Sequence, residues 1–159
     1  MTDTITRVWD RLTSAIRLGR ITNVDESRSV QRVQIQFNDM ETRDNIPALQ
    51  FYGFAASPPV GTNVVVINQS GHSGASIAIG TIDPRVRPTG LGPGESKQHD
   101  NSGQYVHLQG GSKIVIHANS EVDITCSSAV NITAPEVKVT GVLKVTGHIE
   151  VNGVTVAVP

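Results

Sequence analysis

The chain is poor in cysteine, in net charge and in long apolar runs. Its single cysteine, Cys126, excludes an intrachain disulfide. Thirteen basic residues against 14 acidic ones leave a formal net charge of −1, which gives no electrostatic footprint for nucleic acid or for an anionic membrane. Charges recur every few positions in residues 1–18, so we expect no secretory leader. No stretch approaches the length of a membrane-spanning helix.

Aromatic residues are also scarce, at 4% of the chain, and none follows Tyr105. The final third must therefore build any core from aliphatic, mostly β-branched side chains. Such a composition favours a thin, regular β structure over a globule.

Residues 1–18 are predicted to form the one helical segment, beginning near Thr2, Asp3 or Thr4 and ending at Gly19. Its apolar residues follow i, i+3, i+4, i+7 and i+11 spacing: Ile5, Val8, Trp9, Leu12 and Ile16. Two interpretations remain open. The helix packs on its own domain, or it is a docking arm for a neighbouring subunit.

Residues 19–83 carry five strand patterns, which we place at 18–26, 30–38, 47–54, 61–69 and 76–83. Val33, Ile35 and Phe37 alternate with polar residues, and residues 64–67 form a continuous apolar run. Five short strands with Gly and Pro between them fit a small closed barrel of OB type. Residues 84–104 are rich in Pro, Gly and polar residues and are predicted to be a semi-extended linker.

Residues 105–159 contain short apolar-x-apolar triplets separated by Asn, Ser, Ala-Pro or Gly. The triplets begin at intervals of 8, 8, 7, 6, 6 and 5 residues, so the repeat shortens toward the C-terminus. Both apolar members of a triplet lie on one face of a strand. We predict that these residues form a core shared between chains: Ile114, Ile116, Val122, Ile124, Val130, Ile132, Val137, Val139, Leu143, Val145, Ile149, Val151, Val154 and Val156.

A ribbon with one apolar face needs a cover, because each aliphatic side chain gains about 2 kcal/mol on burial. Rungs of 5 to 8 residues are short for a single-chain β-helix, whose coils are longer. A sandwich needs more hairpin turns than the single Asn152-Gly153. Three copies, each giving one rung per layer, would bury the apolar faces together. We therefore predict an all-β fold with an N-terminal helix, an OB-like barrel and a trimeric β-helix or β-prism.

The order of the predicted elements resembles a known family: a helix, a small barrel, a Pro/Gly linker and a tapering repeat. The most characteristic residues are the repeats VDIT, VNIT, VKVTG, LKVTG and IEVNG, which follow GHSGASIAIGTID at the end of the barrel. The family is the central spike, or baseplate assembly protein V, of contractile-tailed bacteriophages, in its short Mu-like form. The resemblance implies a homotrimer at the tip of the tail tube in the virion, assembled in the host cytoplasm. It implies a barrel joined to hub and tube proteins, and a spike driven through the bacterial outer membrane on contraction. Tail-like bacteriocins and type VI secretion systems use a similar part.

The chain departs from the family at its end. Many relatives finish in a histidine-x-histidine pair that binds iron at the apex, and this pair is absent here. His148 and Glu150 are the nearest candidate ligands, but they lie on the face opposite Ile149 and Val151. We therefore expect no metal or other cofactor, and either a metal-free tip or a separate tip-cap protein.

No catalytic constellation is predicted. Larger relatives carry a lysozyme domain, but the corresponding linker holds only Glu95 and Asp100. The sequence Gly71-His72-Ser73-Gly74 lacks the flanking residues of a nucleophile elbow or phosphate loop, so we interpret it as a turn. Cys126 is interpreted as a structural thiol, and Asn131-Ile132-Thr133 as an unmodified acceptor sequence.

The sequence thus predicts a non-enzymatic tail spike that pierces the outer membrane and serves as a hub for baseplate assembly. One alternative is an OB-type binding module, for which Arg32, Phe51 and Tyr52 are the candidate contacts. The other is a β-helical receptor-binding fibre, although no aromatic sugar platform follows Tyr105. Nucleic acid is not an expected partner.

Overall fold

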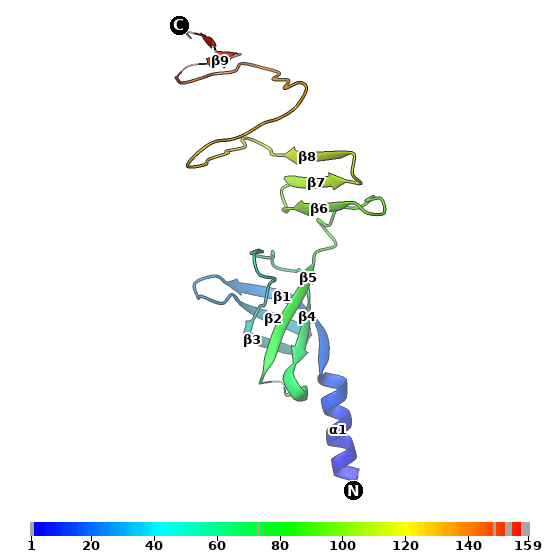
Figure 1. Cartoon of the computed structure of the whole chain (residues 1–159). Coiled ribbons are helices and arrows are strands. Elements are labelled where there is room, and N and C mark those ends of the chain that lie inside the picture. Colours follow the sequence, from blue (N-terminus) through cyan, green and yellow to red (C-terminus); the bar gives the residue numbers. More distant parts are fainter. Residues whose placement is uncertain (1, 73, 148, 152–153, 157–159) are drawn as a thin grey trace. The chain divides into compact units, whose positions relative to one another are not determined.

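The computed structural model describes residues 2–72, 74–147, 149–151 and 154–156 of the chain. The chain divides into two compact units, Met1–Ser120 and Glu121–Pro159. Figure 1 shows the first unit as a helix, a five-stranded sheet and a three-stranded sheet in chain order. The predicted all-β class with one N-terminal helix is confirmed.

Helix α1 spans Thr2–Ser14 and is shorter than predicted, because strand β1 (Ile16–Asp25) already begins at Ile16. Asn68 ends the helix. Its side-chain amide donates to the Ser14 carbonyl (2.5 Å) and its backbone N–H donates to the Ala15 carbonyl (2.8 Å). The Ser14 and Ala15 carbonyls thus find hydrogen-bond donors in Asn68, in place of the N–H groups that a further helical turn would supply.

The five-stranded sheet has the order β3-β2-β1-β4-β5, with β2 at Arg32–Asn38, β3 at Glu41–Pro47, β4 at Asn63–Asn68 and β5 at Ser76–Ile82. A parallel bridge between Ala48, directly after β3, and Ala78 of β5 joins the two edges. The two edge strands therefore meet at this one point, and the sheet curves into a small barrel. Its buried core consists of Ile21, Val33, Ile35, Ile46, Val64, Val66 and Ala78.

Strand β1 approaches the core closely at Gly19. A Cβ on this residue would overlap Cγ2 of Ile35, so any larger side chain would push the strand away from the core.

Four of the five predicted strands lie where the sequence pattern placed them, and the third does not. Residues 47–54 were predicted as a strand, but the third strand is Glu41–Pro47, and the stretch after it is a loop. Strand β3 is mostly polar, with Ile46 as its one fully buried side chain. Antiparallel pairing with β2 through a tight turn holds it in place, so cross-strand pairing outweighs its low intrinsic β propensity.

Part of the predicted linker is a strand. Strand β6 (Ser96–His99) lies within residues 84–104 and pairs with β7 (Tyr105–Gln109), which pairs with β8 (Lys113–His117). In the second unit, β9 (Ile149–Val151) and β10 (Val154–Val156) form an antiparallel pair. Residues 121–147, which carry most of the repeat, contain no helix or strand. The intertwined trimeric shaft therefore stays a prediction.

Asp83 fastens the end of β5 to the next segment. Its carboxylate accepts hydrogen bonds from Nε (2.8 Å) and Nη2 (2.6 Å) of Arg85, from the Arg85 N–H (3.0 Å) and from the Thr62 hydroxyl (3.3 Å). The Arg85 guanidinium is the main cause that lowers the pKa of Asp83 from 3.8 to about 2.

We expect Asp83→Asn to destabilise the fold at neutral pH and to make its stability less dependent on pH in the acid range. Because the folded pKa is depressed, the carboxylate stabilises the fold fully above its unfolded pKa of 3.8, and this contribution is lost as pH falls toward about 2. Urea unfolding followed by circular dichroism should show the wild-type midpoint falling across that window and the variant's midpoint already lowered at neutral pH. Identical midpoints for the two proteins at pH 7 would contradict the assignment.

Candidate functional site

The predicted shared-core residues are exposed in a single chain. Ten of the fourteen side chains have exposed fractions between 51% and 72%: Ile114, Ile116, Val122, Ile124, Val130, Ile132, Val137, Val139, Leu143 and Val151. Val145 and Ile149 are half-buried. The side chains of Val154 and Val156 lie outside the described residues. The chain therefore leaves most of its repeated apolar face without a cover of its own.

The sheet β6-β7-β8 has one apolar and one polar face. Val106 pairs with Ile116, and Leu108 pairs with Ile114, so two cross-strand apolar pairs lie side by side on one face. All four of these side chains are exposed. The alternating burial along β7 places Val106 and Leu108 on the face opposite Tyr105, His107 and Gln109.

The other face of this sheet is held by aromatic and polar contacts. Tyr105 stacks on the His117 ring at 5.2 Å between centroids, and Lys97 Nζ lies 3.4 Å from the Tyr105 centroid. His107 Nε2 lies 3.3 Å from a Glu95 carboxylate oxygen, and Glu95 also accepts from the Gly92 N–H. These contacts cover the polar face within the chain, whereas the apolar face has no such cover.

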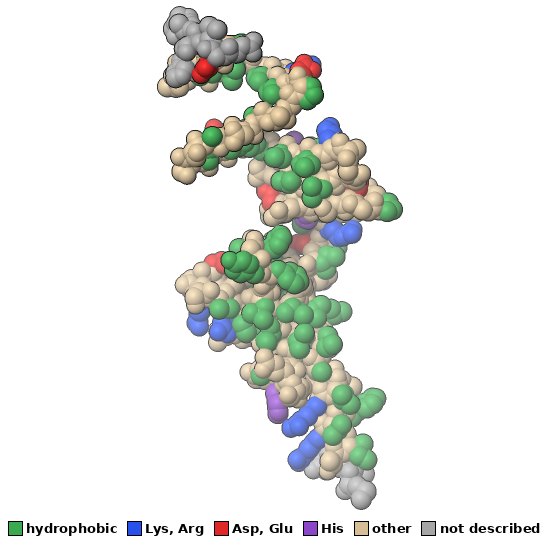
Figure 2. All heavy atoms as spheres, viewed as in Figure 1, with side chains coloured by type: hydrophobic (Ala, Val, Ile, Leu, Met, Phe, Trp, Pro, Cys, Tyr) green, Lys and Arg blue, Asp and Glu red, His purple; other side chains and the backbone are tan. Residues whose placement is uncertain are grey.

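The barrel has a second apolar surface on its outside. Strand β1 pairs with β4 at Ile16–Ile67 and Leu18–Val65, and β4 pairs with β5 at Ile67–Ile77 and Val65–Ile79. Two cross-strand rows of aliphatic side chains result, which we name the outer apolar face: Ile16, Leu18, Val65, Ile67, Ile77 and Ile79. Figure 2 shows hydrophobic side chains gathered over β4 and β5 and along one side of α1. The continuous apolar run of β4 is thus buried on one side only.

Helix α1 does not cover this surface. The apolar side chains of the helix, which we name the helix stripe (Ile5, Val8, Trp9 and Leu12), are 53–68% exposed. Contact between α1 and the barrel is made at the helix C-terminus, against the turn Gln69–Gly71. The structure contradicts the interpretation of a helix packed on its own domain, and the docking-arm interpretation stays a prediction.

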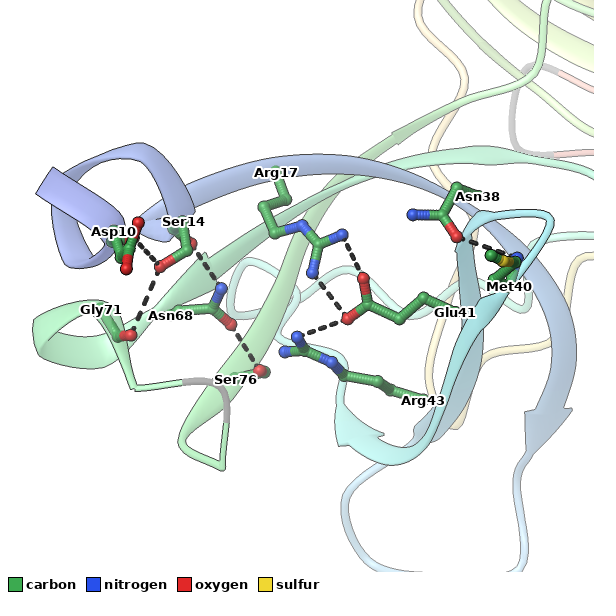
Figure 3. A network of polar contacts seen from close by, with 10 residues as sticks. All are labelled: Asp10, Ser14, Arg17, Asn38, Met40, Glu41, Arg43, Asn68, Gly71 and Ser76. Atoms are coloured by element: carbon green, nitrogen blue, oxygen red, sulfur yellow. Dashed lines mark hydrogen bonds and ion pairs between the residues drawn. The ribbon is translucent and has the colours of Figure 1, made fainter. Parts of the chain in front are cut away.

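Figure 3 shows the hydrogen bonds that hold the C-terminal end of α1 on the barrel. Asn68 reaches the Ser14 carbonyl on one side and accepts from the Ser76 hydroxyl (2.5 Å) on the other. Gly71 has φ +70°, and a Cβ there would lie 2.6 Å from the Arg11 carbonyl oxygen. The direction in which α1 leaves the barrel is therefore fixed by a buried amide and by a glycine.

The same view contains an ion cluster at the turn between β2 and β3. The Glu41 carboxylate accepts hydrogen bonds from both terminal nitrogens of Arg17 (2.8 and 2.6 Å) and forms an ion pair with a terminal nitrogen of Arg43 (2.5 Å). The Arg17 guanidinium also stacks 4.0 Å from the Phe37 centroid. The hydrogen bonds from Arg17 are the main cause that lowers the pKa of Glu41 to about 2, so this carboxylate is ionised and satisfied. We assign the cluster a structural role.

Sequence reasoning missed an aromatic loop between β3 and β4. Phe51, Tyr52 and Phe54 are strongly exposed, and Tyr52 makes almost no contact with the rest of the chain. Gln50 closes the loop, because its side chain donates to the Ala56 carbonyl and accepts from the Ala56 N–H, both at 2.7 Å. A cavity of about 300 Å³ lies under the loop, lined in part by Leu49, Phe54 and Ala78. The run of aromatics predicted a strand, and only the Gly53 within it signalled a turn.

The other weighed residues have structural explanations. The predicted turn at residues 71–74 is confirmed for the residues described there, with Ser73 outside them. Asp100 accepts from the Ser102 and Gln104 N–H groups, and the Gln104 side chain is the main cause that lowers its pKa. Cys126 is exposed and not buried. Glu150 is exposed on β9, and the candidate ligand His148 lies outside the described residues.

Within the described part of the chain, no group of three or more His, Cys, Asp and Glu side chains is arranged to hold a metal ion. In the same residues, no helix has the length and apolar character needed to cross a membrane.

Comparison with known proteins finds that residues 19–85 match the model of the family described as "Bacteriophage Mu Gp45, N-terminal". The chain is 25% identical over 130 residues to the "Baseplate puncturing device gp45" of Escherichia phage Mu, a match that covers 82% of this chain and 66% of the Mu protein. It is also 25% identical over 137 residues to the "Mu-like prophage FluMu protein gp45" of Haemophilus influenzae, covering 84% and 72% of the two chains. The chain thus spans just under two thirds of the Mu protein, and the resemblance to Mu-like baseplate spike proteins is confirmed.

The anchoring of α1 predicts that Gly71→Ala loosens the helix. The positive φ alone costs a non-glycine residue about 1 kcal/mol or more, and the new Cβ would also overlap Arg11. Gly74→Ala in the same turn is the matched control, because a Cβ there meets nothing within 4 Å. Limited proteolysis should cut between α1 and β1 faster in Gly71→Ala than in either Gly74→Ala or the wild type. Equal cleavage rates in all three would show that Gly71 does not fix the helix.

Proposed function

We propose that this protein is the trimeric, non-enzymatic central spike of a contractile phage tail. The observation that carries the proposal is the exposed repeat: ten predicted core side chains are more than half exposed in one chain, on a face that alternates with polar residues. Water contact across such a face is unfavourable, and three identical chains sharing one axis would remove it. The relative named a puncturing device supports the same role at the coarser level of a baseplate component.

The shaft we propose is a β-helix or β-prism in which each chain supplies one rung per layer. Residues 121–147 lack strand pairing within the chain, which leaves their backbone groups available for pairing with other copies. The repeat shortens from 8 to 5 residues, so successive layers have a smaller circumference. A shaft of this kind tapers to a point.

We further infer that the barrel is an OB-type fold. Its strand order and the parallel closure between Ala48 and Ala78 support this assignment, because they describe a five-stranded Greek-key barrel. In the proposed assembly the barrel is the hub that contacts other baseplate and tube proteins. The outer apolar face is the surface we assign to these neighbours, since its side chains are aliphatic and the chain covers them only in part: Ile16 and Leu18 are exposed, and the other four are half-buried.

The proposed action is mechanical. Tail contraction pushes the shaft, tip first, through the bacterial outer membrane, and this needs stiffness but no catalytic group. The protein would reside at the baseplate tip of the virion after assembly in the host cytoplasm. The tip would be metal-free or covered by a separate cap protein, because the five histidines of the sequence include no histidine-x-histidine pair.

A second candidate function is binding of a small or polymeric ligand by the barrel. The aromatic loop above the 300 Å³ cavity favours it, since Phe51 and Tyr52 are exposed and Phe51 also lines the cavity. Binding of single-stranded DNA or an oligosaccharide by the pure protein, lost in Tyr52→Ala, would support this alternative. The net charge of −1 argues against nucleic acid.

The proposed shaft predicts that Val139→Asp abolishes trimer formation, because three carboxylates would meet on a dry axis. Thr140→Asp is the matched control, since its side chain lies on the opposite face of the same rung. Light scattering after size-exclusion chromatography should give a three-chain mass for the wild type and Thr140→Asp, and a one-chain mass for Val139→Asp. A wild-type monomer at micromolar concentration would refute the trimer, and a trimeric Val139→Asp would refute the assignment of the inward face.

The outer apolar face predicts that Leu18→Ser weakens incorporation into baseplates without unfolding the barrel. Leu18 is 73% exposed, so its loss leaves no internal cavity. Complementation of a phage lacking the spike should yield fewer intact particles with Leu18→Ser than with Arg20→Ser, an exposed control two residues further along β1. Equal particle yields would remove this face from the assembly.

A further inference from the structure

The helix stripe is an exposed apolar surface that neither the barrel core nor the proposed shaft covers. Helix α1 has 13 residues, and all its described side chains up to Thr13 are exposed. A helix of this length is marginal in water unless its apolar side packs on something. Because Asn68 and Gly71 hold the C-terminal end, α1 does not fold back over its own barrel.

We infer that the helix stripe packs against the helix stripes of two other copies of this chain, forming a short parallel three-helix bundle. This bundle is a second contact between copies, separate from the shaft. The inference rests on the proposed trimer, because the shaft holds the three chains together.

The pattern of the stripe indicates self-association. Ile5, Val8 and Leu12 are spaced as a-d-a positions of a heptad, and Trp9 occupies the adjoining e position. β-Branched residues at both the first a and the first d position shift parallel coils from two strands toward three or more. Copies related by a threefold axis are necessarily parallel, which is the orientation this rule describes.

The charges of α1 allow three copies to approach. Asp3 and Asp10 balance Arg7 and Arg11, so the helix carries no net charge to repel its neighbours. Fewer than two full heptads would not associate on their own. Chains already joined through the shaft raise the effective concentration of the helices to the millimolar range, at about the level of short flexible linkers.

Anchoring of α1 lowers the entropy that the helix loses when it contacts other copies. The hydrogen bonds from Asn68 to Ser14 and Ala15 fix the helix end before any copy binds, so little further order is needed on association. The four side chains of the stripe remain exposed from Ile5 to Leu12 although the helix end is held.

Trp9 is the one tryptophan in the sequence and provides a direct readout. In a single chain its side chain is 67% exposed. In the purified full-length trimer, the inference predicts blue-shifted emission and an acrylamide quenching constant several-fold below that of free tryptophan amide. Val8→Asp should shift the emission to the red and restore quenching while the mass remains that of three chains. Wild-type trimer with freely quenched Trp9 would overturn the inference.

Cysteine cross-linking provides the second test. Exposed Cys126 is first replaced by serine, and the parent's three-chain mass is checked by light scattering. Under mild oxidation Leu12→Cys should link about two thirds of the chains into dimers, since one chain of each threefold set is left over. Asp10→Cys, on the opposite side of the same helix, is the matched control and should give few dimers.

The outcomes separate the two proposals. A monomeric parent would refute the proposed trimer, and the helix bundle with it. A trimeric parent in which Leu12→Cys cross-links no better than Asp10→Cys would refute only the bundle. That second result, together with quenchable Trp9, is what a stripe reserved for a different protein would give.

Discussion

The structure depends on one constraint: the chain carries more apolar surface than it can bury alone. The barrel core is small and complete, with seven buried aliphatic side chains. Around it, most of the repeat and the helix stripe are exposed, and the outer apolar face is only half-buried except at exposed Ile16 and Leu18. Each of these surfaces is regular, in rungs, in cross-strand rows or in helical spacing. Regular, exposed apolar surfaces are features of proteins that bury them by association with other chains.

The sequence predicted the barrel well where burial and pattern agree. Strands β1, β2, β4 and β5 were found because their inward residues, such as Val33, Ile35 and Val66, alternate or run together as buried strands do. The third strand was misplaced because aromatic residues have high β propensity, whereas the residues that form β3 are polar. Its position depends on pairing with β2 and on Arg17 binding Glu41 from β1, and such contacts between distant residues are invisible in a local pattern.

The candidate surfaces were only partly predictable. Alternation predicts an inward face for the repeat, and β7 shows the same period of two in its burial, because the backbone of a strand sets that period. The outer apolar face depends on the register between three strands, which places Ile16 beside Ile67 and Ile67 beside Ile77. No single-strand pattern contains that information. The helix stripe was visible in the sequence, but its lack of a partner within the chain followed only from the way Asn68 ends the helix.

The anchoring of α1 also determines how load would pass through the head. Force applied along the helix reaches β4 through the two hydrogen bonds that Asn68 makes to the Ser14 and Ala15 carbonyls. From Asn68 it divides between β1, which pairs with β4 along five residues, and β5, which pairs with it along six. The side-chain bond from Ser76 braces the same asparagine from the β5 side. Asn68 is therefore the residue through which force on the helix is transmitted to the barrel.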